Sequence, residues 1–125
     1  MPRVAVVEDN PDNRLLLQAI LGERFAVLEY ASGEEALAGF AAERPHVVLL
    51  DISLPGMDGL EILARIRADA ALAGLPVIAL TAHAMAGDRE RYLAAGFDDY
   101  LTKPIVDETR LIEAISRQLR KESSE

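Results

Sequence analysis

The sequence predicts an α/β fold built around a parallel β-sheet. Five strand-like segments alternate with five segments of helical periodicity, and this alternation is typical of βα repeats. Several of the strand-like segments are uninterrupted runs of Val, Ile and Leu, as expected for strands buried on both faces of a parallel sheet. The predicted strands are residues 3–7, 25–30, 46–51, 76–81 and 98–102.

Capping patterns and apolar spacing predict the helices between these strands. The first helix follows Asn10 as N-cap, with Pro11 at its first position and Gly22 at its end. The second opens with the capping box that starts at Ser32, and the third opens at Asp58. The fourth is predicted over residues 84–95 and the fifth over 107–121, with a frayed polar tail at 121–125.

The predicted fourth helix has a thin apolar face. Apart from alanines, its apolar residues are Met85, Tyr92 and Leu93. A helix with few apolar contacts has low local stability, and elements of low stability are the ones that move in switching. This composition indicates that the fourth helix takes part in a conformational change.

Length and composition limit the possible functions of the chain. Its 125 residues fit a single domain, 50% of them hydrophobic and 27% charged, as in soluble globular proteins. No apolar run approaches the roughly 20 residues that span a bilayer, so we expect no membrane association. Without cysteine or a leader pattern, we expect a cytoplasmic protein.

The formal net charge of −8 argues against nucleic-acid binding, because that affinity depends on neutralising phosphates with Lys and Arg. A short basic stretch near the C-terminus contains Arg117, Arg120 and Lys121. We interpret it as favourable charge at a helix C-terminus.

Chemically competent side chains follow four of the predicted strands. Glu8 and Asp9 follow the first strand, Asp51 ends the third, Thr81 ends the fourth and Lys103 follows the fifth. In a parallel sheet the carboxyl ends of the strands lie along one edge, where open α/β folds bind ligands. These residues are therefore expected to converge.

Three converging carboxylates need compensation. Two of them about 4–5 Å apart repel by roughly 3–4 kcal/mol at an effective dielectric constant near 20. Such a cluster raises its pKa values or binds a cation, and a donor set of oxygens favours Mg²⁺. Capping of a following helix is an equally good explanation for Glu8 and Asp9, but not for Asp51, because the next helix opens only at Asp58.

Four segments resemble the response-regulator receiver domain of two-component signalling, over essentially the full length of the chain. Together, in this order and at this spacing, they are highly specific. They are residues 6–10 (Val-Val-Glu-Asp-Asn), 48–59 (Val-Leu-Leu-Asp-Ile-Ser-Leu-Pro-Gly-Met-Asp-Gly), 78–82 (Ile-Ala-Leu-Thr-Ala) and 96–104 (Gly-Phe-Asp-Asp-Tyr-Leu-Thr-Lys-Pro).

The resemblance implies a doubly wound, flavodoxin-like fold with strand order 2-1-3-4-5 and a phosphoacceptor at Asp51. The phosphoryl donor would be a phosphohistidine on a histidine kinase or a histidine phosphotransfer protein. Asp9, Asp51 and the backbone carbonyl of Ser53 would ligate Mg²⁺, with Glu8 acting largely through water. Such a protein assists its own phosphorylation and is not an enzyme that turns over a substrate.

The resemblance also implies the remaining roles. Thr81 and Lys103 would each bind a phosphoryl oxygen, and Pro104 would follow a cis peptide bond. Phosphorylation would draw Thr81 inward, Tyr100 would follow, and the surface of the fourth helix, last strand and fifth helix would bind a downstream protein. Ser53 and His83 occupy positions that tune the lifetime of the phosphoryl group.

Three alternatives stay open. An aspartate-nucleophile phosphatase places a second Asp two residues after the first, where this chain has Ser53. A flavin-binding module needs hydroxyl and backbone N–H groups where this chain has Glu8 and Asp9. A receiver that binds partners without phosphorylation is disfavoured by the complete set of acids, Thr and Lys. The receiver either stands alone or belongs to a hybrid histidine kinase.

Overall fold

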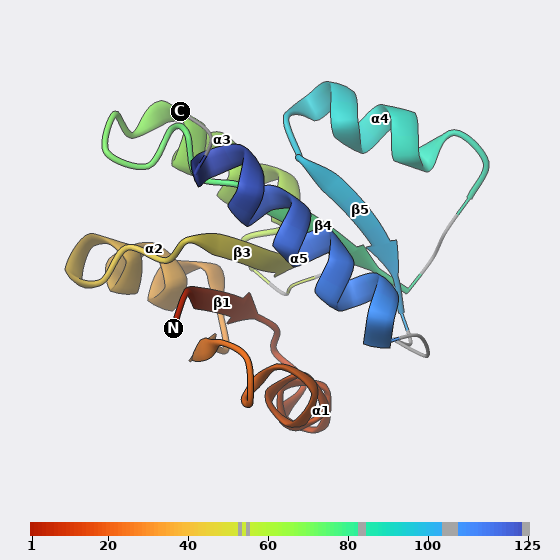
Figure 1. Cartoon of the computed structure of the whole chain (residues 1–125). Coiled ribbons are helices and arrows are strands. Elements are labelled where there is room, and N and C mark those ends of the chain that lie inside the picture. The colour runs from red at the N-terminus through yellow and green to blue at the C-terminus, as the bar shows by residue number, and fades with distance from the viewer. Residues whose placement is uncertain (53, 55, 83–84, 104–107, 124–125) are drawn as a thin grey trace.

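The computed structural model describes residues 1–52, 54, 56–82, 85–103 and 108–123, with side chains to residue 120. Strands and helices alternate along this part of the chain, as predicted (Figure 1). In chain order the elements are β1 (Arg3–Val7), α1 (Pro11–Leu21), β2 (Ala26–Tyr30), α2 (Gly33–Ala42), β3 (Val47–Asp51), α3 (Gly59–Ala68), β4 (Val77–Thr81), α4 (Asp88–Ala95), β5 (Asp99–Thr102) and α5 (Glu108–Ser123).

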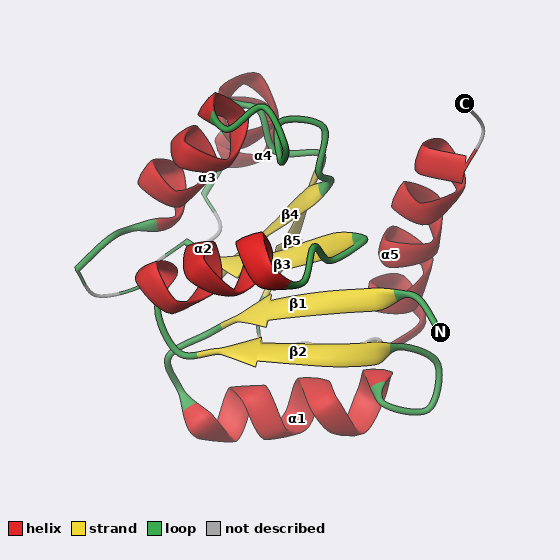
Figure 2. Ribbon diagram, turned by 90° about the vertical axis from the view of Figure 1, so that its left-hand side faces the viewer, coloured by secondary structure: helices red, strands yellow, loops and turns green. Residues whose placement is uncertain are grey.

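The strands form one parallel sheet with the order β2-β1-β3-β4-β5, which confirms the expected fold class. The chain passes from β1 to β2 on one side of β1 and then returns to place β3 on the other side. Ligands bind doubly wound sheets at such a reversal of direction, next to the carboxyl ends of the two strands. Here those two strands are β1 and β3, which Figure 2 shows side by side.

Two hydrophobic cores cover the two faces of the sheet. The first contains buried residues of α2, α3 and α4, and the second contains those of α1 and α5. The strands alternate between them: in β1, Ala5 and Val7 belong to the first core. Val4 and Val6 belong to the second. Burial on both faces explains why these strands are continuous apolar runs.

Side-chain caps start the first three helices where the sequence predicts them. Asn10 Oδ1 accepts the backbone N–H of Asp12 at 2.8 Å. Ser32 Oγ accepts that of Glu35 at 3.2 Å. Asp58 Oδ1 accepts that of Glu61 at 2.9 Å. Each cap satisfies an N–H group that the first turn of a helix leaves without an intrahelical partner.

The fourth helix is shorter than predicted. α4 begins at Asp88 and not at Ala84, and residues 83–84 lie outside the described chain. Gly87 has a φ of 87°, a left-handed conformation that ends any continuous helix at this point. Asp88 and Tyr92 are the buried residues of α4, so the thin apolar face predicted for this helix is confirmed.

The last helix, α5, is described from Glu108, because Asp107 lies outside the described residues. It continues to Ser123, two residues beyond the predicted end at Lys121. The frayed tail expected for residues 121–125 stays a prediction. None of the described helices is both long and apolar enough to cross a membrane.

Arg67 of α3 bonds to the two segments that precede β4 and β5. Its guanidinium donates to the carbonyl oxygens of Leu75 (2.6 Å) and Gly96 (2.8 Å) and to Asp98 Oδ2 (2.9 Å). Asp98 Oδ2 also accepts the backbone N–H of Val77 at 2.8 Å. One side chain thereby ties α3 to the segments before β4 and β5.

We expect Arg67→Met to lower the free energy of unfolding by about 1–3 kcal/mol, because part-buried carbonyl and carboxylate acceptors lose their donor. Urea unfolding followed by circular dichroism measures this loss. Arg65→Met is the matched control, since Arg65 is exposed on the same helix. Equal free energies of unfolding for the two variants would show that the hydrogen bonds of Arg67 do not stabilise the fold.

Candidate functional site

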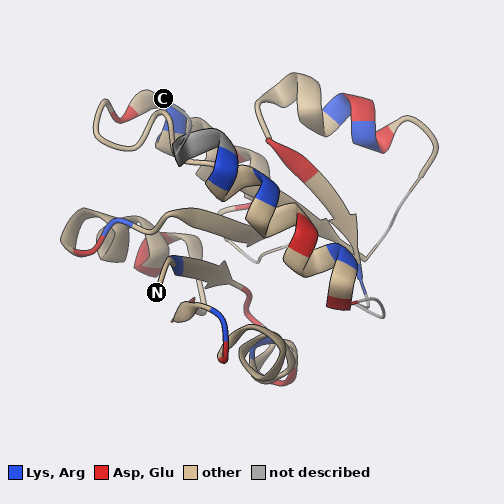
Figure 3. Ribbon diagram, viewed as in Figure 1, with Lys and Arg blue, Asp and Glu red and all other residues tan. Residues whose placement is uncertain are grey.

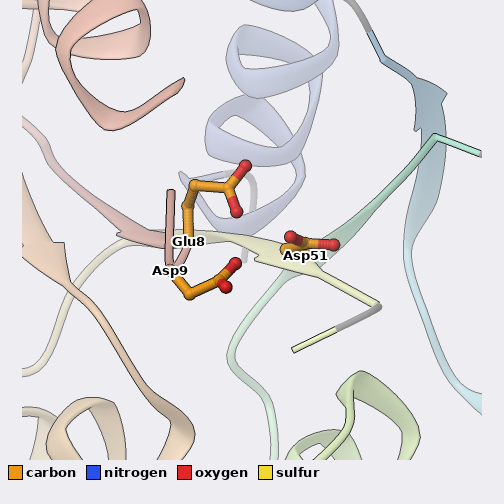
Figure 4. Close-up of side chains that lie close together, drawn as sticks. All are labelled: Glu8, Asp9 and Asp51. Atoms are coloured by element: carbon orange, nitrogen blue, oxygen red, sulfur yellow. The ribbon is translucent and has the colours of Figure 1, made fainter. Parts of the chain in front are cut away.

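The carboxyl ends of β1 and β3 bring three acidic side chains together (Figure 4). One carboxylate oxygen from each of Glu8, Asp9 and Asp51 lies within 4.8 Å of the other two. Glu8 and Asp51 are buried, whereas Asp9 is exposed. The expected convergence of these acids is therefore confirmed, and it follows from the parallel pairing of β1 with β3.

Lys103 brings a positive charge to this cluster from the end of β5. Its Nζ donates to Glu8 Oε1 at 2.6 Å and to Asp51 Oδ2 at 3.1 Å. The lysine side chain is 15% exposed and the glutamate side chain 1%. These ion pairs join residues that are 95 and 52 positions apart in sequence, so they depend on the complete sheet.

One lysine does not neutralise three carboxylates. Burial raises the pKa of Glu8 above its ordinary value, and the neighbouring Asp51 raises it further against the opposing effect of Lys103. Burial by itself would lower the pKa of Lys103, but its hydrogen bonds to Glu8 and Asp51 outweigh this, and its pKa is raised. The ammonium group therefore stays charged, and the cluster keeps an excess of negative charge.

Two residues of α1 support the cluster, and our sequence reasoning missed both. Asn13 Nδ2 donates to Glu8 Oε1 at 2.9 Å, and Arg14 Nη1 donates to the carbonyl oxygen of Glu8 at 2.7 Å. Both residues lie in the first turns of the helix that Asn10 caps. In the sequence, only their position just after the N-cap Asn10 indicates that they support the site, because the first turns of that helix lie beside the end of β1.

Thr81 lies at the end of β4 and is buried, with 3% of its surface exposed. It is one residue beyond Leu80, which pairs in register with Asp51. Its carbonyl oxygen accepts the backbone N–H of Lys103 at 2.7 Å. The sheet thus places Thr81 on the strand next to Asp51, at the same edge.

Tyr100 of β5 is buried between the sheet and α4. Its ring stacks on Tyr92 with centroids 5.6 Å apart, and Tyr92 meets Phe97 edge to face. Among the described residues, the hydroxyl group of Tyr100 has no hydrogen-bond partner. Burial, followed by the charge of Asp88, raises the pKa of this hydroxyl, so it stays protonated.

Some of the predicted functional residues lie outside the described chain, namely Ser53, His83 and Pro104. The proposed carbonyl ligand at Ser53 and the cis peptide bond before Pro104 therefore stay predictions. The other histidine, His46, is structural, because its Nδ1 accepts the backbone N–H of Arg3 at 2.8 Å.

The donor atoms of the cluster fit a hard divalent cation. All of them are oxygens, and Glu8 Oε2 is buried without a hydrogen-bond partner in the described part of the chain. A buried carboxylate oxygen without a partner is costly unless a proton or a cation satisfies it. The described residues thus suit Mg²⁺ better than a softer metal.

Comparison with known proteins identifies the class. The response regulator receiver domain family matches residues 4–116. The chain belongs to this family, the receiver domains of two-component systems. The strand order, the acidic cluster at the ends of β1 and β3, and Lys103 agree with that membership.

Particular relatives differ widely in length. The chain is 45% identical over 108 residues to the sensor protein GacS of Pseudomonas syringae pv. syringae, matching 83% of this chain and 12% of GacS. It is 39% identical over 121 residues to the polar-differentiation response regulator DivK of Brucella anthropi, matching 95% of this chain and 98% of DivK. The chain therefore spans about one-eighth of one relative and nearly all of the other.

A solved structure resembles this fold closely. It is the receiver domain of a sensor histidine kinase from Pseudomonas aeruginosa PAO1, solved with a magnesium ion coordinated in its active site cleft. The TM-score is 0.85 at 36% sequence identity, with 94% of this chain and 97% of that chain covered.

Proposed function

We propose that this chain accepts a phosphoryl group on Asp51 and relays the signal by changing which proteins it binds. The observation that supports this proposal most directly is the contact of 3.1 Å between Lys103 Nζ and Asp51 Oδ2, inside a buried cluster of acids. A buried carboxylate next to a fixed ammonium group has a cation ready for the charge of an incoming phosphoryl group.

The proposed reaction forms one bond and breaks another. A carboxylate oxygen of Asp51 attacks phosphorus, and the P–N bond to the imidazole of a donor phosphohistidine breaks. The imidazole leaves with the electron pair, and Asp51 becomes an acyl phosphate. The group is later lost to water, so each phosphorylation modifies the protein once and no separate substrate is turned over.

The side chains around the acceptor bind either the metal ion or the phosphoryl group. Asp9 and Asp51, with the carbonyl of Ser53, would hold Mg²⁺, and Glu8 would act largely through water. When bound, Mg²⁺ supplies positive charge that neutralises the phosphoryl oxygens. Lys103 binds one phosphoryl oxygen, and its short contact with Glu8 keeps the ammonium group beside the acceptor.

The signal would leave through Thr81 and Tyr100. Thr81 binds a phosphoryl oxygen and moves toward Asp51, and the ring of Tyr100 follows. Tyr100 stacks on Tyr92 of α4, and α4 is held to the sheet by few buried residues, so a movement of the ring is transmitted to this helix. A phosphate adds about −1.5 to −2 charges, enough to bias a bistable element.

The proposed partners are of two kinds. The phosphoryl donor is a histidine kinase or a histidine phosphotransfer protein, and a downstream protein binds the face of α4, β5 and α5. We propose that residues 1–125 form one receiver domain. The chain matches nearly all of one response regulator and a small part of one long sensor protein. These matches are consistent with a receiver that stands alone and with one that belongs to a hybrid histidine kinase.

Incubation with acetyl phosphate and Mg²⁺, followed by intact-mass measurement, tests the proposal. We expect the wild type to gain one phosphoryl group as acetate leaves. Asp51→Asn should gain none, because an amide is a poor nucleophile and cannot form the acyl phosphate. Asp12→Asn is the matched control, since Asp12 is an exposed acid on α1.

Phosphorylation of Asp51→Asn to the same extent as the wild type would overturn the assignment. If the wild type is phosphorylated to the same extent with Mg²⁺ and with excess EDTA, the proposed role of Mg²⁺ is wrong. In either case the fold and the family membership would be unaffected.

A further inference from the structure

A polar notch lies at the outer edge of the sheet, between α4 and α5. Its volume is about 390 Å³, and it is away from the acidic cluster around Asp51. Charged side chains dominate its lining, with Leu101 and Ala114 as its aliphatic members. The other lining residues are Arg89, Asp99, Tyr100, Arg110, Glu113 and Arg117.

A buried carboxylate organises two of the arginines. The side chain of Asp99 is 6% exposed, and each of its oxygens has a guanidinium partner. Arg89 Nη1 of α4 lies 3.3 Å from Oδ1, and Arg117 Nη1 of α5 lies 3.2 Å from Oδ2. Asp99 thereby pairs with an arginine of α4 and an arginine of α5, which lie at the two sides of the notch.

Arg89 and Arg117 have N–H groups that their contacts with described residues do not use. A guanidinium has five N–H donors, and the contacts of Arg89 and Arg117 with described residues all use Nη1. Their side chains are 53% and 54% exposed. One carboxylate shared by two guanidinium groups also leaves a positive charge without compensation by Asp99.

The charge of the notch is opposite to that of the whole chain. The chain has a formal net charge of −8, whereas the described residues that line the notch include three arginines and two acids. Figure 3 shows Lys and Arg segments on both α4 and α5, on either side of β5. A local positive site on an acidic protein attracts anionic groups and orients them.

We propose that this arginine notch binds a carboxylate side chain from an acidic segment of a partner protein. The guanidinium fork matches a carboxylate in a bidentate arrangement, and the scarcity of aliphatic lining disfavours an apolar small molecule. This inference rests on the proposed function, because it assigns a chemistry to the partner that binds the face of α4, β5 and α5.

The notch is also placed to respond to the switch. Arg89 moves with α4, whereas Arg117 belongs to α5, which is anchored by the buried residues Leu111 and Ile115. A displacement of α4 changes the separation of the two guanidinium groups and therefore the fit of a carboxylate between them. An acidic segment would bind the phosphorylated and unphosphorylated forms with different affinities.

Titration of the ¹⁵N-labelled full chain with a capped acidic pentapeptide, Glu-Asp-Gly-Asp-Glu, tests the inference by NMR. We expect saturable shifts of the Nε–Hε signals of Arg89 and Arg117 and no such shifts with the Gln-Asn-Gly-Asn-Gln peptide. Arg117→Gln should weaken binding about tenfold, the effect of losing one charge-assisted contact. Arg89→Gln should also weaken it, because Arg89 is the guanidinium on the other side of the notch.

Arg120→Gln is the matched control, because it removes the same charge from an exposed position of α5 outside the notch. Its binding should stay within about twofold of the wild type, as expected for an exposed charge. Equal weakening by Arg117→Gln and Arg120→Gln would overturn the inference, and so would the absence of saturable shifts at the notch.

The titration uses unphosphorylated protein, so its outcome does not depend on Asp51 chemistry. Peptide binding at the notch together with no phosphorylation at Asp51 would overturn only the proposed function. Phosphorylation at Asp51 together with no peptide binding would overturn only the arginine notch.

Discussion

Lys103→Met is expected to lower the free energy of unfolding at pH 7 by about 3–5 kcal/mol, the cost of leaving buried carboxylates without their cation. Glu8 and Asp51 are both buried, and Lys103 is bonded to each. Methionine fills a similar volume, so the loss measures charge and hydrogen bonding more than packing. Phosphorylation by acetyl phosphate should fall as well, because the phosphoryl oxygens lose an ammonium partner.

The stability loss should shrink as the pH falls. The pKa of Glu8 is raised in the folded protein by burial and by Asp51, and removal of Lys103 raises it further. The loss of stability caused by ionised Glu8 is therefore complete at pH values above the pKa that Glu8 has in the folded variant. As the pH falls through that value, the folded state takes up a proton before the unfolded chain does, so the unfolding free energy of the variant recovers toward that of the wild type.

Urea unfolding at pH 7 and pH 5, without added metal, measures both effects. Lys103→Arg keeps the charge and should lose much less stability, and Arg120→Met controls for removal of a positive charge at the surface. An equal loss at both pH values for Lys103→Met would show that repulsion among the acids is not its cause.

Gly59→Ala is expected to slow phosphorylation of Asp51 on the order of 10²-fold, because a displacement of about 1 Å at a reacting group has an effect of this size. A Cβ atom at position 59 would lie 2.7 Å from Ile52 Cα and 3.3 Å from the carbonyl oxygen of Asp51. Since the close atoms are backbone atoms, they move only if the end of β3 moves. We also expect a stability loss of about 1–3 kcal/mol, as for other overpacked sites.

Gly74→Ala is the matched control, because a Cβ at that position meets nothing within 4 Å and Gly74 has no positive φ. Its stability should be unchanged or raised by about 0.4–1 kcal/mol through the unfolded chain. Acetyl phosphate kinetics and urea unfolding of both variants make the comparison. Equal phosphorylation rates in the two variants would show that the end of β3 tolerates the added methyl group.

The sequence alone determines the fold class and the acidic cluster. Strand order 2-1-3-4-5 and the convergence of Glu8, Asp9 and Asp51 are both confirmed. The parallel sheet and the convergence were predictable from the residues, because apolar runs buried on both faces specify parallel strands and the carboxyl ends of parallel strands share one edge. The strand order was implied by the resemblance to receiver domains. Side-chain caps at Asn10, Ser32 and Asp58 were predictable for a similar reason, since each depends on residues close in sequence.

The start of α4 could not be obtained in this way. Ala84, Met85 and Ala86 are all good helix formers, so local preference extends the helix to residue 84. In the structure, Gly87 is left-handed and Asp88 Oδ2 accepts the backbone N–H of Met85 at 2.9 Å. This local turn outweighs the helical preference of the residues before it.

Only the tertiary structure decides the partners of the charged side chains. Lys103 lies closer to Glu8 than to Asp51, Arg67 joins three separate segments, and Asp99 pairs with arginines from two helices. Their partners lie as far as 95 positions away in sequence. Apolar patterning places a residue on a face or at an edge, but it does not specify which buried charge an ammonium or guanidinium group reaches, because that depends on the packing of helices against the finished sheet.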